Sequence, residues 1–69
     1  MAATLSWDDI GDIADALFAA YPDLEPLTVS FPRLLQMILG LAEFSGEPDA
    51  ANERRLEAIQ MAWYDLAEG

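Results

Sequence analysis

The chain contains no cysteine, no histidine and no lysine among its 69 residues, and each absence excludes a class of chemistry. Without cysteine there is no disulfide, no thiol nucleophile and no thiolate ligand for a metal. Without histidine there is no imidazole base and no side-chain nitrogen ligand, and without lysine no Schiff base can form. Carboxylates, hydroxyls and the backbone remain, and their spacing matches no catalytic motif, so we expect no enzyme.

Positive charge is also scarce. Three arginines stand against thirteen acidic residues, and the formal net charge is −10. The resulting negative field repels nucleic acid and favours cationic partners, either a basic protein surface or a metal ion.

Length and hydrophobicity bound the architecture. The chain has 69 residues, of which 54% are hydrophobic, so we expect one folded domain over residues 1–69, with residues 1–4 flexible. The longest apolar stretch, residues 34–42, is far shorter than the roughly 20 residues of a membrane span. The N-terminus lacks the basic and apolar regions of a secretory signal. We therefore expect a cytoplasmic protein that does not bind membranes and is a monomer when free.

Hydrophobic spacing predicts three helices. The first begins with a capping box, in which Ser6 is the N-cap and Asp9 is the third helical residue, and it ends before Pro22. The second begins with Pro32 as its first residue and runs to Leu41. It is apolar nearly all round, which predicts the central, most buried helix. The predicted buried positions of the first helix are Ile10, Ile13, Ala14, Leu17, Phe18 and Tyr21.

The third helix is predicted to start between Pro48 and Asn52 and to fray near Gly69. Residues 28–31 are compatible with a short strand, and residues 44–48 with a loop. The predicted fold class is all-α, a small domain of three to four helices with at most a short β segment and a winged-helix-like or helix-turn-helix-like topology. The predicted buried stripe of the third helix is Leu56, Ile59, Trp63 and Leu66, and the aromatic residues assigned to the core are Phe18, Tyr21, Phe44, Trp7 and Trp63.

Acidic residues gather in the first helix and in the connector that follows it. Asp8, Asp12 and Asp15 have the spacing i, i+4 and i+7, which places them on one face, opposite the apolar stripe. Such a face serves either solubility or the docking of a basic partner, and both interpretations stay open. Asp23 and Glu25 lie between two prolines, where they serve turn formation or extend the docking face.

A third acidic group surrounds the start of the third helix. Its members are Glu47, Asp49, Glu53 and Glu57. They compensate the helix dipole and pair with the nearby arginines, or they bind a hard cation such as Fe²⁺. Since there is no EF-hand loop and no histidine, we expect at most weak metal binding and no tightly bound cofactor.

Two signatures in the chain resemble those of the IscX family, small acidic accessory proteins of bacterial iron–sulphur cluster assembly. They are AYPDLEP at residues 20–26 and NExxLEAIxxxW at residues 52–63. The resemblance extends from about Leu5 to Glu68. The matching positions are Trp7, Tyr21, Pro22, Asp23, Pro26, Asn52, Glu53, Leu56, Glu57 and Trp63, together with the acidic positions Asp12 and Asp15.

The resemblance implies a mostly helical, winged-helix-like protein without enzymatic activity. It implies binding to a cysteine desulfurase, in competition with the frataxin homologue, and weak iron binding through exposed acids. Ala19, Gly40 and Ala42 depart from the acidic or polar pattern of the family, which thins the negative surface.

We therefore expect a non-enzymatic adaptor or regulator that binds a cysteine desulfurase through an acidic face. The alternative is a weak ferrous-iron carrier or sensor. The residues assigned to partner binding are Asp8, Asp12, Asp15, Asp23 and Glu25, and those assigned to weak metal binding are Glu53, Glu57 and Asp49.

Overall fold

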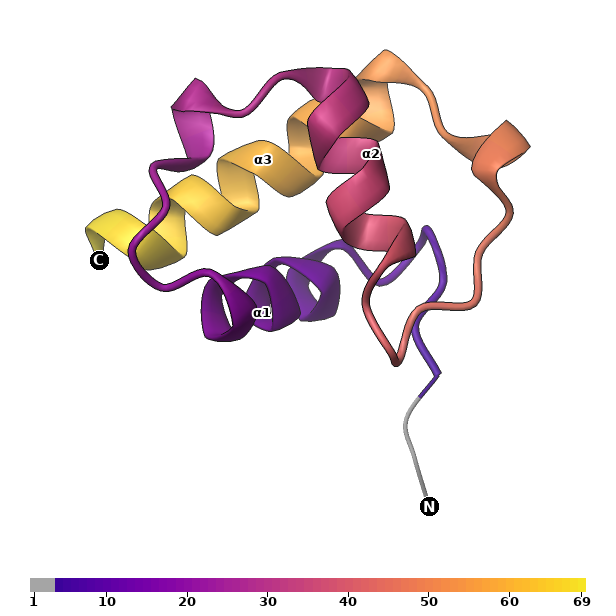
Figure 1. The fold of residues 1–69 in the computed structure, drawn as a ribbon, viewed down its shortest axis with the longest axis horizontal. Coiled ribbons are helices and arrows are strands. Elements are labelled where there is room, and N and C mark those ends of the chain that lie inside the picture. Colours follow the sequence, from indigo (N-terminus) through magenta and orange to yellow (C-terminus); the bar gives the residue numbers. More distant parts are fainter. Residues whose placement is uncertain (1–3) are drawn as a thin grey trace.

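Three α-helices form the protein in the computed structural model, which describes residues 4–69 (Figure 1). The prediction for residues 1–4 therefore lies outside the described residues, except for the exposed Thr4. The predicted all-helical class is confirmed, and within the described range the β pairing is limited to one isolated bridge. A winged-helix-like topology stays a prediction. The elements are α1 (Ile10–Ala20), the 3₁₀ turn η1 (Pro26–Thr28), α2 (Phe31–Leu39), the 3₁₀ turn η2 (Pro48–Ala50) and α3 (Glu53–Glu68).

The start of α1 differs from the prediction. The backbone of Asp9 has φ −91° and ψ 57°, which is not helical, so the helix begins at Ile10 and not directly after Ser6. Half of the predicted capping box is present, because the Asp9 carboxylate accepts a hydrogen bond from the backbone N–H of Ser6 at 2.9 Å. Residues 6–9 form a separate turn before α1. Asp8 therefore precedes the helix and is not part of its face.

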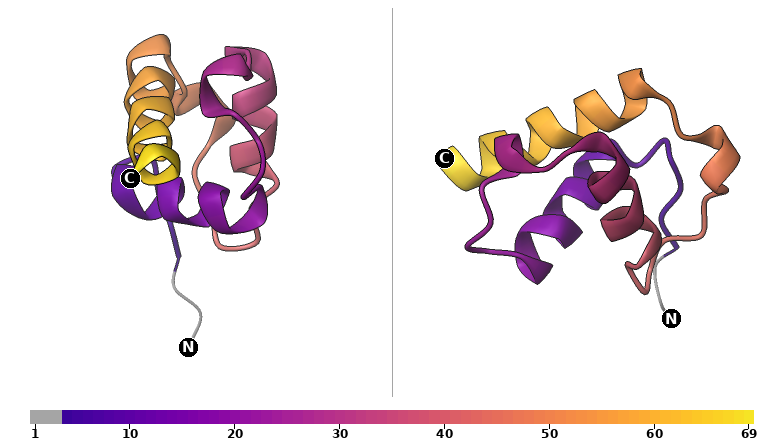
Figure 2. Two further views of the ribbon diagram at one scale, coloured as in Figure 1. Left: turned by 90° about the vertical axis from the view of Figure 1, so that its left-hand side faces the viewer. Right: turned by 45° about the horizontal axis from the view of Figure 1, so that its top comes forward.

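The core lies mainly between α1 and α3, which make the most extensive contact in the molecule. α1 contributes Ile13, Ala14 and Leu17, and α3 contributes a matching stripe. In the left view of Figure 2, α3 and α2 stand on opposite sides and α1 crosses below them. The prediction that the second helix is the central one is wrong, because α2 is amphipathic and exposes Pro32, Arg33 and Gln36 to solvent. The buried stripe of α3 consists of Leu56, Ile59 and Trp63.

The connector between α1 and α2 is a 3₁₀ turn followed by a cap, and the short strand considered for residues 28–31 is absent. Gln60 of α3 fixes this connector, since its side-chain amide donates to the carbonyl oxygens of Pro26 at 2.8 Å and Val29 at 3.1 Å. Ser30 caps α2, which makes Phe31, and not Pro32, its first residue. α2 ends at Leu39, two residues short of the predicted end.

The chain's N-terminal segment is joined to the loop between α2 and α3. The backbone of Leu5 donates to the Glu43 carbonyl at 2.7 Å and accepts from the Ser45 N–H at 2.9 Å. The Trp7 indole packs edge-on against the Phe44 ring, with a centroid distance of 4.8 Å. The loop predicted from glycine and proline at residues 44–48 is therefore present, and it also carries part of the core.

Not every apolar residue assigned to the core is buried. Trp7 and Trp63 are buried and Phe44 is half-buried, as predicted. Phe18, Tyr21 and Leu66 are 36%, 38% and 37% exposed, so those three assignments are wrong. Phe18 and Leu66 lie near the C-terminal ends of α1 and α3, and Tyr21 directly follows α1. These two helix ends lie on the same side of the molecule (Figure 1). No helix within residues 4–69 is long and apolar enough to cross a membrane.

Candidate acidic docking face

Two exposed aspartates form the centre of the acidic face. Asp12 and Asp15 lie one turn apart on α1, and both are exposed because Ile13, Ala14 and Leu17 take the buried side of the helix. The three-residue helical stripe predicted from the sequence is thus two residues on the helix. Asp8 is exposed in the turn that leads into α1.

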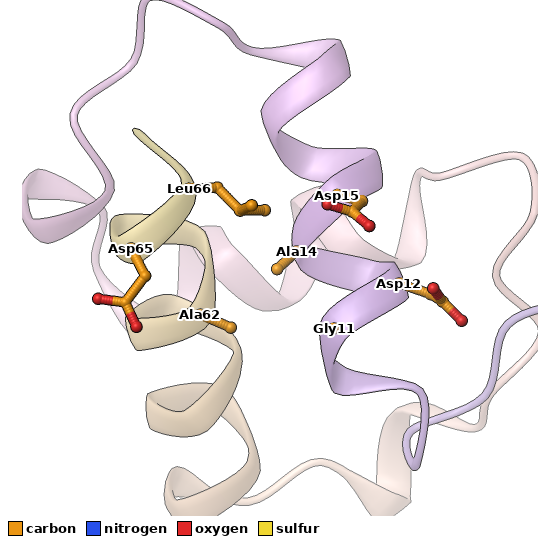
Figure 3. Close-up of a pocket in the computed structure, with 7 residues that line it drawn as sticks. All are labelled: Gly11, Asp12, Ala14, Asp15, Ala62, Asp65 and Leu66. Atoms are coloured by element: carbon orange, nitrogen blue, oxygen red, sulfur yellow. The ribbon is translucent and has the colours of Figure 1, made fainter. Parts of the chain in front are cut away.

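A hollow lies between these aspartates and α3 (Figure 3). Ala14, Ala62 and Leu66 point into the space between the two helices. The carboxylates of Asp12 and Asp15 point away from α3, and that of Asp65 points away from α1. The hollow therefore has an apolar floor and acidic rims on both sides. Its lining is Gly11, Asp12, Ala14, Asp15, Ala62, Asp65 and Leu66.

A second hollow lies on the other side of the same two aspartates. It is lined by Leu5, Ala16 and Glu43 in addition to Asp12 and Asp15. Asp12 and Asp15 thus form a ridge between two hollows, and we call them the aspartate ridge. Acidic residues from three parts of the chain line the two hollows, namely Asp12, Asp15, Glu43 and Asp65, and no arginine lines either hollow.

Sequence reasoning missed two of these four acids. Glu43 follows α2 and reaches the ridge because its carbonyl oxygen is bonded to Leu5. Asp65 lies in the last turn of α3, and only the packing of α3 on α1 brings it to the same hollow as Asp12 and Asp15. No local spacing in the sequence indicates either contact, because both depend on packing between segments far apart in the chain.

No arginine lines the two hollows of this face. Arg54 and Arg55 are in the first turn of α3, whereas Asp65 is in the last. Arg55 and Asp65 are ten positions apart on α3, a rise of about 15 Å along the helix axis, which exceeds the screening length of about 8 Å at physiological ionic strength. Arg33 lines a different hollow, beside Asp23.

Asp23 and Glu25 are not brought to the ridge. Asp23 shares its hollow with Tyr21, Pro22 and Leu24. Glu25 is exposed and precedes η1, where its carbonyl oxygen accepts a hydrogen bond from the Thr28 hydroxyl at 2.7 Å. Both residues therefore lie outside the two hollows beside Asp12 and Asp15.

The residues assigned to weak metal binding are all exposed. Asp49 lies in η2, and Glu53 and Glu57 lie on α3, one turn apart. Throughout residues 4–69, no three or more acidic side chains are placed to hold a metal ion together. These three residues therefore do not form a preassembled site in this structure.

Comparison with known proteins identifies relatives of the whole domain. A family model described as iron-sulphur cluster assembly matches residues 5–68. An uncharacterised protein of Pseudomonas aeruginosa strain PAO1 is 39% identical over 62 residues, which cover 90% of this chain and 94% of that protein.

Proposed function

We propose, from the premise that the chain belongs to the IscX family of iron–sulphur cluster assembly proteins, that it is a non-enzymatic adaptor or regulator of that process. It binds a cysteine desulfurase by placing the aspartate ridge on a basic patch of that enzyme. Family membership supports the process, and the acidic face supports the mode of binding. What we propose beyond family membership is the identity of the partner and the part that the aspartate ridge plays in binding it.

The observation that carries this proposal is the uncompensated ridge. Asp12 and Asp15 have Glu43 on one side and Asp65 on the other, and no arginine lines the intervening hollows. Such an arrangement attracts a basic surface over about one screening length, which speeds encounter and makes affinity fall with salt. Asp8 adds to this field from the adjacent turn. Asp23 and Glu25, outside both hollows, contribute through their charge alone.

The composition limits how the protein can influence its partner. A chain without cysteine cannot accept the sulfur atom that a desulfurase releases. Any change in the desulfurase rate must therefore come from docking, through blocking or reshaping the enzyme's surface. This is why we describe the protein as an adaptor or regulator and not as a carrier of sulfur.

Calorimetric titration onto the desulfurase of the same organism, at low and high salt, tests the proposal. We expect saturable binding that weakens as salt rises. The variant Asp12→Lys/Asp15→Lys should bind on the order of 10- to 100-fold more weakly, because charge reversal opposes the basic patch. The matched control is Asp49→Lys/Glu57→Lys, which changes the net charge equally at exposed positions outside the hollows.

The two variants separate ridge docking from a general effect of charge. Retained helical circular dichroism in both would show that the fold is intact. Equal loss of affinity in both would contradict the role of the ridge, and wild-type binding absent at every salt concentration would contradict the desulfurase as the partner.

A further inference from the structure

The hollow between α1 and α3 is lined by small residues that leave open space, and no contact within this chain requires that space. Its floor is made by Gly11, Ala14 and Ala62, none of which extends beyond Cβ, and its wall by Leu66. We infer that this hollow receives one apolar side chain of the partner protein, flanked on the partner by arginine or lysine residues. The inference rests on the proposed function and adds an apolar anchor to the charged contact.

Gly11 supplies the first argument. A Cβ atom added at this position would meet no atom within 4 Å beyond its chain neighbours and the backbone of its own helix, so crowding does not exclude a side chain. No glycine of the described chain has a positive φ, so backbone conformation does not demand glycine either. Glycine within a helix is unfavourable relative to alanine. The open space above Gly11 thus serves no contact inside this chain, and it leaves room for a group from outside.

Leu66 supplies the second argument. Its side chain is 37% exposed although it lies beside the buried stripe of α3, and it points into the hollow with Ala14 and Ala62 (Figure 3). A partner's aliphatic or aromatic side chain placed against Leu66 would remove apolar surface from water on both sides.

The rims define the surroundings of that apolar side chain. Asp12 and Asp15 stand on one side of the hollow and Asp65 on the other. A basic partner with cations on both sides of its apolar side chain complements this arrangement. A second copy of this chain does not, because each copy carries a net charge of −10 and would bring acidic rims together.

Filling the hollow without altering charge tests the inference. In Gly11→Leu the new side chain occupies the space, and we expect at least tenfold weaker binding to the desulfurase with an unchanged dependence on salt. Leu66→Ala removes the wall and should also weaken binding, which keeps the test valid if Gly11→Leu folds poorly. Ala50→Leu is the matched control, since Ala50 is exposed in η2 and does not line the hollow.

The outcomes distinguish this inference from the proposed function. If Gly11→Leu and Leu66→Ala bind like the wild type while Asp12→Lys/Asp15→Lys does not, the apolar anchor is wrong and ridge docking stands. If none of these variants changes binding, both are wrong. A dimer of the free wild type in sedimentation experiments that Gly11→Leu dissociates would overturn the inference, because the occupant would then be a second copy.

Discussion

The indole nitrogen of Trp7 donates a hydrogen bond to the carbonyl oxygen of Glu47 at 2.7 Å, across 40 residues of sequence. This bond and the backbone pairing of Leu5 close the N-terminal segment on the loop between α2 and α3. The same closure holds Glu43 in the hollow beside the aspartate ridge. The residues that shape one side of the docking face therefore depend on this junction and not on a helix.

Gly46 is the most restrictive position in this junction. A Cβ atom there would lie 2.8 Å from Cδ1 and Nε1 of Trp7 and 2.5 Å from Cζ of Phe44. Gly46→Ala must therefore displace two packed rings, and we expect a loss of about 1–3 kcal/mol in the free energy of unfolding. Chemical denaturation followed by tryptophan fluorescence measures it.

Gly11→Ala is the control for this substitution. It adds the same methyl group to a glycine with open space around it, inside a helix. We expect unchanged or raised stability, by up to about 1 kcal/mol, because alanine is the better helix former. A Gly46→Ala variant as stable as Gly11→Ala would mean that the junction tolerates the methyl group and is not tightly packed.

The side chain of Gln60 holds the connector in place, and we expect its replacement to lower the stability of the fold. Its amide satisfies two carbonyl oxygens of the connector, those of Pro26 and Val29. Gln60→Met keeps the size of the side chain and removes both donors, and we expect a loss of about 1–3 kcal/mol in stability. Gln36→Met is the comparison, since Gln36 is exposed on α2. Equal melting temperatures for the two variants would show that water replaces the Gln60 bonds at no cost.

The N-terminal caps of α2 and α3 should contribute unequally to the stability of the fold. The Asn52 side chain accepts from the Arg55 N–H at 2.8 Å, whereas the Ser30 hydroxyl accepts from the Arg33 N–H at 3.4 Å. We expect Asn52→Ala to lower stability by about 1 kcal/mol, and Ser30→Ala by less, because the longer bond is weaker. Thermal unfolding monitored by circular dichroism measures both, and the reverse order would contradict this ranking.

The helices could be predicted from local patterns, and their packing could not. Proline and glycine signals placed α2 and α3 within a few residues, since caps and breakers act locally. The capping pattern predicts the start of α1 too early: residues 6–9 form a turn, in which Trp7 donates a hydrogen bond to Glu47, a partner 40 residues away. The apolar composition of α2 predicts a central helix, but burial depends on how the helices pack on one another.

The part of the docking face that lies on one helix could also be predicted from local spacing, and the part that depends on packing could not. Asp12 and Asp15 share a helix face by spacing alone. Glu43 and Asp65 join them through the Leu5 backbone pairing and through the α1–α3 contact, which no single segment encodes. Charge alone predicts that Asp23 and Glu25 extend this face, yet they lie outside both hollows beside the ridge.

Iron binding gives the last prediction. Glu53 and Glu57 are one turn apart on α3 and Asp49 precedes them, but no three acids of the described chain are placed together for a metal ion. Two carboxylates supply at most four oxygens to an ion that prefers about six, so most of the hydration shell stays in place. We expect anaerobic titration with Fe²⁺ to show no saturable binding below about millimolar metal.

Glu53→Gln/Glu57→Gln should reduce the residual signal more than Asp12→Asn/Asp15→Asn, which removes equal charge elsewhere. Saturable binding at micromolar Fe²⁺ that Glu53→Gln/Glu57→Gln abolishes would contradict this expectation and support the role of a ferrous-iron carrier.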